Sequence, residues 1–133
     1  MPRFSDTVTA TTDLVRYDFP DIHRGDNFTL TVTYTQDGTL VGSSISCTFR
    51  DENDAVIFTR KNAAAGGGAT ECLITDGANG IFAIYVVPAN TTGLLLQTGA
   101  TRKLKYDVQV TVAGGAVRTV LHGSMTVIGD ATR

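Results

Sequence analysis

The sequence predicts an all-β protein: an immunoglobulin-like antiparallel β-sandwich of about seven strands with an extended N-terminal arm. Three observations support this. Residues 104–112 alternate between apolar and polar side chains, as a half-buried strand requires, because successive side chains point to opposite faces of a sheet. A Gly114-Gly115 pair suited to a tight turn leads into a second alternating run, residues 117–127. Turn signals recur every ~8–12 residues upstream, a spacing typical of sandwiches.

The expected strands lie, in order, at residues 27–35, 44–50, 55–60, 71–75, 81–87, 104–112 and 117–127. The first has the clearest alternation, with threonines on one face and apolar side chains on the other. Residues 81–87 are apolar on both faces, which predicts a central strand that is covered on both sides. Residues 88–96 are the one helical candidate, because Pro88 suits the first turn of a helix.

The first 23 residues are predicted to form the arm, and residues 24–133 the sandwich. The arm alternates irregularly, and Pro20 removes a backbone donor, which argues against a central strand. It is nevertheless too apolar for a disordered tail, and an ordered arm can offset its lost entropy by packing on a neighbour. We therefore expect the arm to cross an oligomer interface, by strand addition or in a groove, through Leu14, Val15, Tyr17, Phe19 and Ile22.

Composition sets limits on location and partners. The 133 residues suffice for one domain with its own core, and the net charge of −2 gives no basic surface for nucleic acid. No run approaches the roughly 18 apolar residues of a membrane helix, and the N-terminus lacks the apolar stretch of a secretion signal. We expect a protein made and kept in a cytosol, with no nucleic-acid, membrane or small-molecule partner.

The two cysteines, Cys47 and Cys72, fall on the apolar phase of expected strands. A sandwich could bring two such positions opposite each other, but buried free thiols are the usual state in a cytosolic protein. Neither His23 nor His122 is near them in the sequence, so no metal site or cofactor is expected.

Three short motifs are interpreted as turns. The Arg-Gly-Asp tripeptide at residues 24–26 precedes a strong strand, where glycine permits a bend. The acidic residues 51–54 lack the ligand spacing and the glycine of a calcium loop. Residues 76–80, Asp-Gly-Ala-Asn-Gly, form a third turn, whose exposed oxygens could hold a weak ion.

No enzyme is predicted. None of the serines lies in a Gly-x-Ser-x-Gly context, and His122 has no acid next to it in the sequence, although distant residues could still meet in space. Tyr34, Tyr85 and Tyr106 fall on apolar phases and are expected in the core.

Several segments together resemble the small β-sandwich modules of tailed bacteriophages and prophages, above all the N-terminal module of baseplate upper proteins and short tail or fibre-associated proteins. The resemblance covers the chain from about residue 24 to the C-terminus. It is carried by residues 24–30 (RGDNFTL), 46–51 (SCTFRD), 55–58 (AVIF), 74–86 (ITDGANGIFAIYV), 88–94 (PANTTGL), 105–111 (KYDVQVT) and 117–127 (VRTVLHGSMTV).

The resemblance implies a non-catalytic virion structural protein of the tail, baseplate, fibre attachment or head. Such a protein would be made in the host bacterial cytoplasm and would dock to other virion proteins, with a homo-oligomer expected. The chain lacks the long C-terminal extension of baseplate proteins. The alternative is a receptor- or glycan-binding adhesion module of a fibre. That reading needs exposed aromatic side chains gathered on one rim, for which Phe4, Tyr17 and Phe19 are the candidates.

Overall fold

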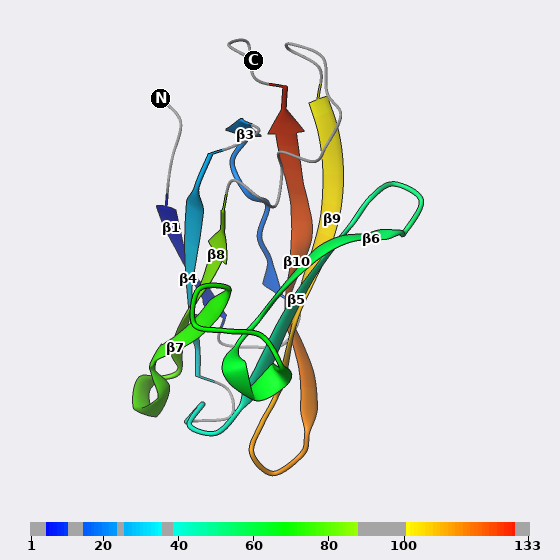
Figure 1. Ribbon diagram of the computed structural model, residues 1–133. Helices are drawn as coiled ribbons and strands as arrows, with labels where there is room; N and C mark the ends of the chain where they lie inside the picture. The colour runs from blue at the N-terminus through cyan, green and yellow to red at the C-terminus, as the bar shows by residue number, and fades with distance from the viewer. Residues whose placement is uncertain (1–4, 11–14, 24–25, 36–38, 88–100, 130–133) are drawn as a thin grey trace.

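The structure, a computed structural model, describes residues 5–10, 15–23, 26–35, 39–87 and 101–129 and consists of two β-sheets packed face to face (Figure 1). The described residues contain no α-helix, only strands and two short 3₁₀ turns, so the predicted all-β sandwich is confirmed. The helical candidate at residues 88–96 lies outside the described residues.

One sheet has four strands in the order β1-β4-β8-β7, and the other has six, in the order β2-β10-β9-β5-β6 with β3 also paired to β10. The seven predicted strands all form, as β4–β10, and three further strands precede them. The strands of the four-stranded sheet are β1 (Ser5–Ala10), β4 (Phe28–Tyr34), β7 (Cys72–Asp76) and β8 (Ile81–Val86). Those of the six-stranded sheet are β2 (Val15–Arg16), β3 (Ile22–His23), β5 (Ser44–Arg50), β6 (Val56–Lys61), β9 (Thr101–Thr111) and β10 (Val117–Ile128).

Pairing directions divide the chain at the start of β4. Strands β4–β10 pair with one another antiparallel, as predicted. In contrast, β1 pairs with β4, and β2 and β3 pair with β10, in parallel. The seven predicted strands therefore form the expected antiparallel framework, and the three N-terminal strands, which the sequence did not predict, make the sheets mixed. Parallel neighbours require a long connection between them, and the sequence pattern of either strand alone does not indicate which partner it finds.

The core lies between the sheets and follows the period of two. In β4 the residues Phe28, Leu30, Val32 and Tyr34 are buried, and the threonines between them are partly exposed. Ile45, Cys47 and Phe49 of β5 approach from the other sheet in the same alternation.

The described part of the N-terminal segment is built into this core. Phe19 is 6% exposed and Ile22 3% exposed, and Val15 and Tyr17 pack against the core while partly buried. Leu14 lies outside the described residues. The described part of the segment therefore belongs to the sandwich. The predicted boundary between an arm (residues 1–23) and the sandwich (residues 24–133) does not separate two structural units there. The side chains of Phe19 and Ile22 contact this chain's own core, so they are not available to a neighbour.

Phe19 is at the centre of an aromatic cluster that joins both sheets. Its ring lies 5.3 Å from that of Phe28 in the four-stranded sheet. The rings of Phe49 and Tyr106 in the six-stranded sheet lie 5.8 Å and 4.9 Å away, both in edge-to-face arrangements. Such pairs stabilise a core beyond the area they bury.

Backbone hydrogen bonds hold residues 17–19 along β10. The amide of Tyr17 donates to the carbonyl oxygen of His122 at 2.9 Å, and the amide of Phe19 to that of Ser124 at 2.8 Å. Between these bonds, the backbone of Tyr17 passes so close to Gly123 that a Cβ there would overlap the Tyr17 carbonyl oxygen. Gly123 is therefore required for this close approach.

Two side chains add to this attachment. The Tyr106 hydroxyl donates to the Tyr17 carbonyl oxygen at 2.5 Å, and burial raises the pKa of Tyr106, so it remains a donor at neutral pH. The Asp18 carboxylate accepts from the amide and the hydroxyl of Ser124 at 3.0 and 3.2 Å. Burial alone would raise the pKa of Asp18, but hydrogen bonds from Arg16 and Ser124 outweigh it and lower this pKa.

The expected turns are present where the structure describes them. Asp51 opens the β5–β6 turn by accepting from the amides of Asn53 and Ala55, and Arg102 pairs with its other oxygen at 3.2 Å. Residues 76–80 form a 3₁₀ turn that Asp76 caps. In the Arg-Gly-Asp tripeptide, Asp26 donates its amide to the carbonyl oxygen of His23, and the other two residues lie outside the described residues.

Candidate functional surfaces

The outer faces of the two sheets differ sharply in charge. On the six-stranded sheet, charged side chains recur on neighbouring strands: Arg50 on β5, Lys61 on β6, and Lys103, Lys105 and Asp107 on β9. On the four-stranded sheet, the strand registers place eleven residues on the outer face, and only Asp76, opposite Ile81 at the end of β7, is charged. We call the other ten residues the uncharged face: Ser5, Thr7, Thr9, Thr29, Thr31, Thr33, Leu73, Ile81, Ala83 and Tyr85.

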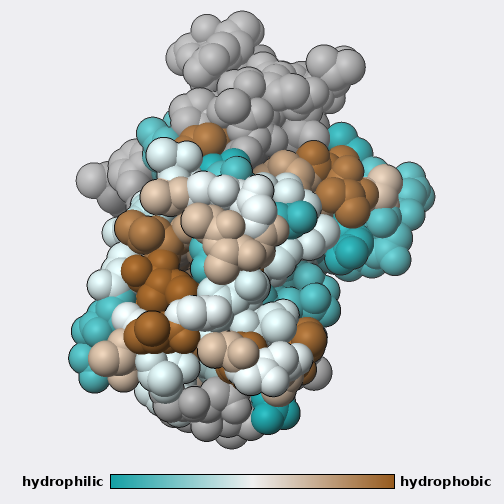
Figure 2. All heavy atoms as spheres, turned by 60° about the horizontal axis from the view of Figure 1, so that its bottom comes forward, coloured by the Kyte–Doolittle hydropathy of each residue, from teal (hydrophilic) through white to brown (hydrophobic). Residues whose placement is uncertain are grey.

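Exposed large apolar side chains occur at scattered positions. Val41, Val56, Leu73 and Val117 are each at least 40% exposed. Figure 2, which brings the lower end of the molecule forward, shows apolar atoms in separate groups with pale, weakly polar atoms between them. Single exposed apolar residues are normal on protein surfaces, so these positions alone do not identify a site.

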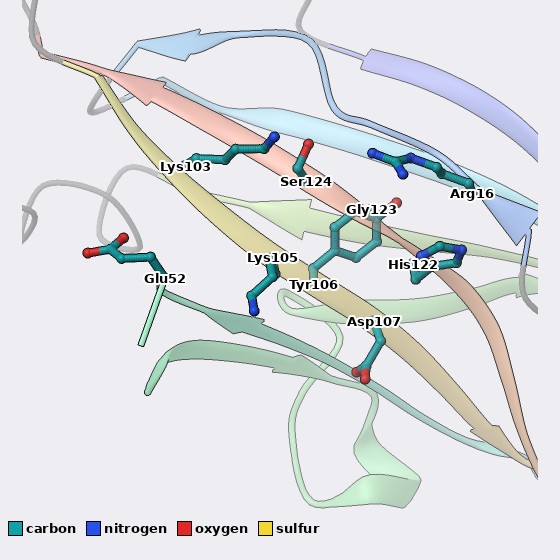
Figure 3. Close-up of a pocket in the computed structure, with 9 residues that line it drawn as sticks. All are labelled: Arg16, Glu52, Lys103, Lys105, Tyr106, Asp107, His122, Gly123 and Ser124. Carbon is teal, nitrogen blue, oxygen red and sulfur yellow. The ribbon is translucent and has the colours of Figure 1, made fainter. Parts of the chain in front are cut away.

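A groove of about 580 Å³ lies on the outer face of the six-stranded sheet (Figure 3). Residues of β9 and β10 form its floor, Arg16 of β2 borders it, and Glu52 of the β5–β6 turn approaches from the other side. The groove carries both signs of charge. Its Arg16 and Lys105 already face the carboxylates of Asp18 and Asp54, at 3.3 and 3.7 Å. These pairs are exposed, so each contributes little to stability.

The groove brings together residues that the sequence keeps apart. The register of β9 and β10 places Asp107 directly opposite His122, and Ser124 follows two residues later on the same face. The sequence analysis found no acid beside His122, because cross-strand neighbours are distant in sequence.

These three residues do not have the geometry of a nucleophilic triad. The Ser124 hydroxyl donates to Asp18, and Asp107 faces Arg50 at 3.8 Å. In Figure 3 the side chains of Asp107 and Ser124 point away from each other. The groove is therefore explained by the charged surface of a solvated sheet.

Both cysteines are free thiols and buried, as predicted, with Cys47 on β5 and Cys72 on β7. Among the described residues, no cluster of three or more potential metal ligands occurs. Burial raises the pKa of Cys47 well above its ordinary value, and the nearby Cys72 raises it further. Burial likewise raises the pKa of Cys72 to about 12.

We expect both thiols to resist iodoacetamide in the folded protein at pH 8 and to react fully in denaturant, because the thiolate is the nucleophile. Mass spectrometry after timed labelling measures this, and rapid labelling of folded protein would contradict the burial.

Both folded-state pKa values are raised, so below pH 9.0 the thiols are protonated in both states. Between pH 9.0 and about 12 only the unfolded chain ionises, and stability should fall as pH rises through this window.

The aromatic residues considered for ligand binding do not form an exposed platform. Phe19 is in the core, and the Tyr17 hydroxyl donates to Asp6 at 2.6 Å, linking the N-terminal segment to β1. Phe4 lies outside the described residues. Tyr34 and Tyr106 are buried as predicted, but Tyr85 is partly exposed on the uncharged face.

Among the described residues, the structure contains no helix long and apolar enough to span a membrane.

No protein-family model matches the chain. No curated protein matches it in sequence. Solved structures with a similar arrangement of strands include the N-terminal domain of phage TP901-1 ORF48, with a TM-score of 0.43 and 11% identity over 95% of this chain and 98% of that one. CopC from Methylosinus trichosporium OB3b matches with a TM-score of 0.40 and 13% identity over 96% of this chain and 87% of that one. Extracellular domains 3–5 of Drosophila OTK match with a TM-score of 0.38 and 15% identity over 90% of this chain and 34% of that one. Similarities at this level do not identify a function, and we infer none from them.

Proposed function

We propose that the chain is a non-catalytic structural protein of a tailed-phage virion, which works by docking to other virion proteins and to copies of itself. The observation that carries the proposal is the position of the segments that resemble phage sandwich modules. Apart from residues 24–25 and 88–94, which lie outside the described residues, these segments fall on β4–β10, the turns between them and the two residues before β4. The resemblance therefore follows the strand framework of both sheets and not one isolated motif.

The uncharged face supports docking as the mode of action. Flat sheet surfaces that remain in water usually carry charged side chains, which also prevent unwanted association. The outer face of the six-stranded sheet follows this rule, whereas that of the four-stranded sheet carries only one charged residue, Asp76, at the end of β7. Because glycan recognition relies on exposed aromatic rings, the position of Phe19 in the core gives the adhesion alternative no support.

Quantitative mass spectrometry of purified infectious particles tests the proposal. The expected result is that the protein is present in a fixed number of copies per particle and remains through repeated density-gradient purification. If the protein is made during infection but absent from infectious particles, the virion role is wrong.

A further inference from the structure

The outer face of β8 presents an aromatic side chain to solvent. The sequence predicts that β8 is covered on both faces, but among the described residues this sheet has no second layer on its outer side, so the expectation is wrong there. Tyr85 is therefore partly exposed, and the register places it directly opposite Thr29 of β4. A tyrosine in this position offers both an apolar ring and a hydroxyl to a ligand.

A hollow of about 400 Å³ is lined by Tyr85. Asn27 and Thr29 border it at the start of β4, and Thr70 approaches from the segment before β7. The amide of Tyr85 donates to the carbonyl oxygen of Glu71 at 3.0 Å, which holds that segment against β8. The size of the hollow lies within the range of small-ligand sites.

The polar groups of the hollow are uncharged and available to a ligand. Four side-chain groups form no hydrogen bond among the described residues: the amide of Asn27 and the hydroxyls of Thr29, Thr70 and Tyr85. None of the described residues that line the hollow is charged. The neighbouring Glu71 carboxylate accepts from a backbone amide of β6 at 3.2 Å and is not part of the lining.

We infer that this hollow binds a neutral saccharide, whose ring stacks on Tyr85 while its hydroxyls bond to the four polar groups. The inference goes beyond the proposed docking role and does not depend on it. It also departs from the expectation of no small-molecule partner. That expectation came from composition, which does not show a hollow built from segments that are distant in sequence.

The chemistry of the lining selects this class of ligand. A phosphate, carboxylate or ammonium group would lose hydration here without gaining an opposite charge. An apolar ligand would cover the four polar groups and leave them without a partner. A neutral saccharide avoids both penalties, because each of its hydroxyls both donates and accepts a hydrogen bond. The C–H groups on one face of a sugar ring can lie against the electron-rich face of the tyrosine ring.

Tyr85 is not one of the aromatic residues that the sequence suggested for glycan binding. Of those, Phe19 is in the core, and the Tyr17 hydroxyl donates to Asp6. The apolar residues on both faces of β8 placed Tyr85 in the predicted core, whereas the structure leaves it partly exposed beside the hollow.

Amide NMR spectra of the full chain test the inference, with maltose, lactose and diacetylchitobiose as probes, each at up to about 50 mM. A small, open site binds such ligands weakly. At least one of the three disaccharides is therefore expected to shift the backbone amides of Asn27, Thr70 and Tyr85, with a dissociation constant in the millimolar range.

Tyr85→Ala removes the ring and should raise the dissociation constant at least about fivefold. Tyr85→Phe keeps the ring and loses only the hydroxyl, so it should bind more tightly than Tyr85→Ala. Leu73→Ala is the matched control, because Leu73 is an outer residue of the same sheet but does not line the hollow. It should bind like the wild type.

Asn27→Ala combined with Thr70→Ala provides a second test, should Tyr85→Ala fail to fold by circular dichroism. Both positions lie outside the strands, and the loss of two hydrogen bonds should raise the dissociation constant at least about fivefold. If none of the three disaccharides shifts these amides, the inference is wrong. Binding that is unchanged in the folded Tyr85→Ala or double variant overturns it too, because the sugar would then lie elsewhere.

Discussion

Replacing Phe19 by alanine is expected to destabilise the protein by about 3–5 kcal/mol, the usual cost of removing a buried phenyl ring. Phe19 contacts rings of both sheets, Phe28 on one side and Phe49 and Tyr106 on the other. Its loss therefore leaves a cavity where the two sheets are joined. Urea unfolding followed by circular dichroism measures the change in the free energy of unfolding.

The control for this variant is Val41→Ala, which shortens an apolar side chain that is 64% exposed and should change stability by less than about 0.5 kcal/mol. If Phe19→Ala is as stable as this control, Phe19 is not part of the core in solution. That result would support the prediction that Phe19 packs across an oligomer interface.

Gly123→Ala is expected to destabilise the protein by about 1–3 kcal/mol, the range for forcing extra atoms into a packed site. The added methyl group would overlap the backbone of Tyr17, so the segment must move off β10 and the hydrogen bond from Tyr106 must weaken. Thermal unfolding measures the loss of stability. Proteolysis within the first 23 residues measures the detachment, which should become faster.

Gly114→Ala is the matched control, since no atom lies within 4 Å of the position its Cβ would occupy. Its stability should match that of the wild type. Equal behaviour of the two alanine variants would show that the close approach of Tyr17 to Gly123 does not occur.

The strand framework could be predicted because β4, β5, β9 and β10 show a period of two within their own residues, and because the shorter runs between them are bounded by turn residues. Strands β2 and β3 could not, because they have two residues each, too few to produce a pattern. Pro20 and the irregular run around it suggested an arm, whereas in the structure Phe19 turns into the core. The requirement for Gly123 arises from a contact with Tyr17, more than a hundred residues away in sequence, and no local signal reveals it.

The surfaces were less predictable than the core. The opposition of Asp107 and His122 depends on the register between two strands, which a bulge near Thr119 shifts. The sequence shows that β8 is apolar on both faces, and this pattern predicts only that other residues cover its outer face. The pattern does not show whether those residues belong to the same chain, because this depends on the topology. The structure places both β4 and β7 beside β8 in the sheet and thereby leaves the outer face open among the described residues.

The position of the N-terminal segment decides which surfaces remain for docking, because a segment needed for folding cannot also serve as a free arm. Urea unfolding of a chain that lacks residues 1–23 tests this most directly. The account predicts no cooperative unfolding transition, since Phe28, Phe49 and Tyr106 lose the ring packed between them and β10 loses its parallel neighbours. A truncated chain that unfolds cooperatively, with a stability close to that of the full chain, would contradict it and would identify the first 23 residues as an arm outside the sandwich.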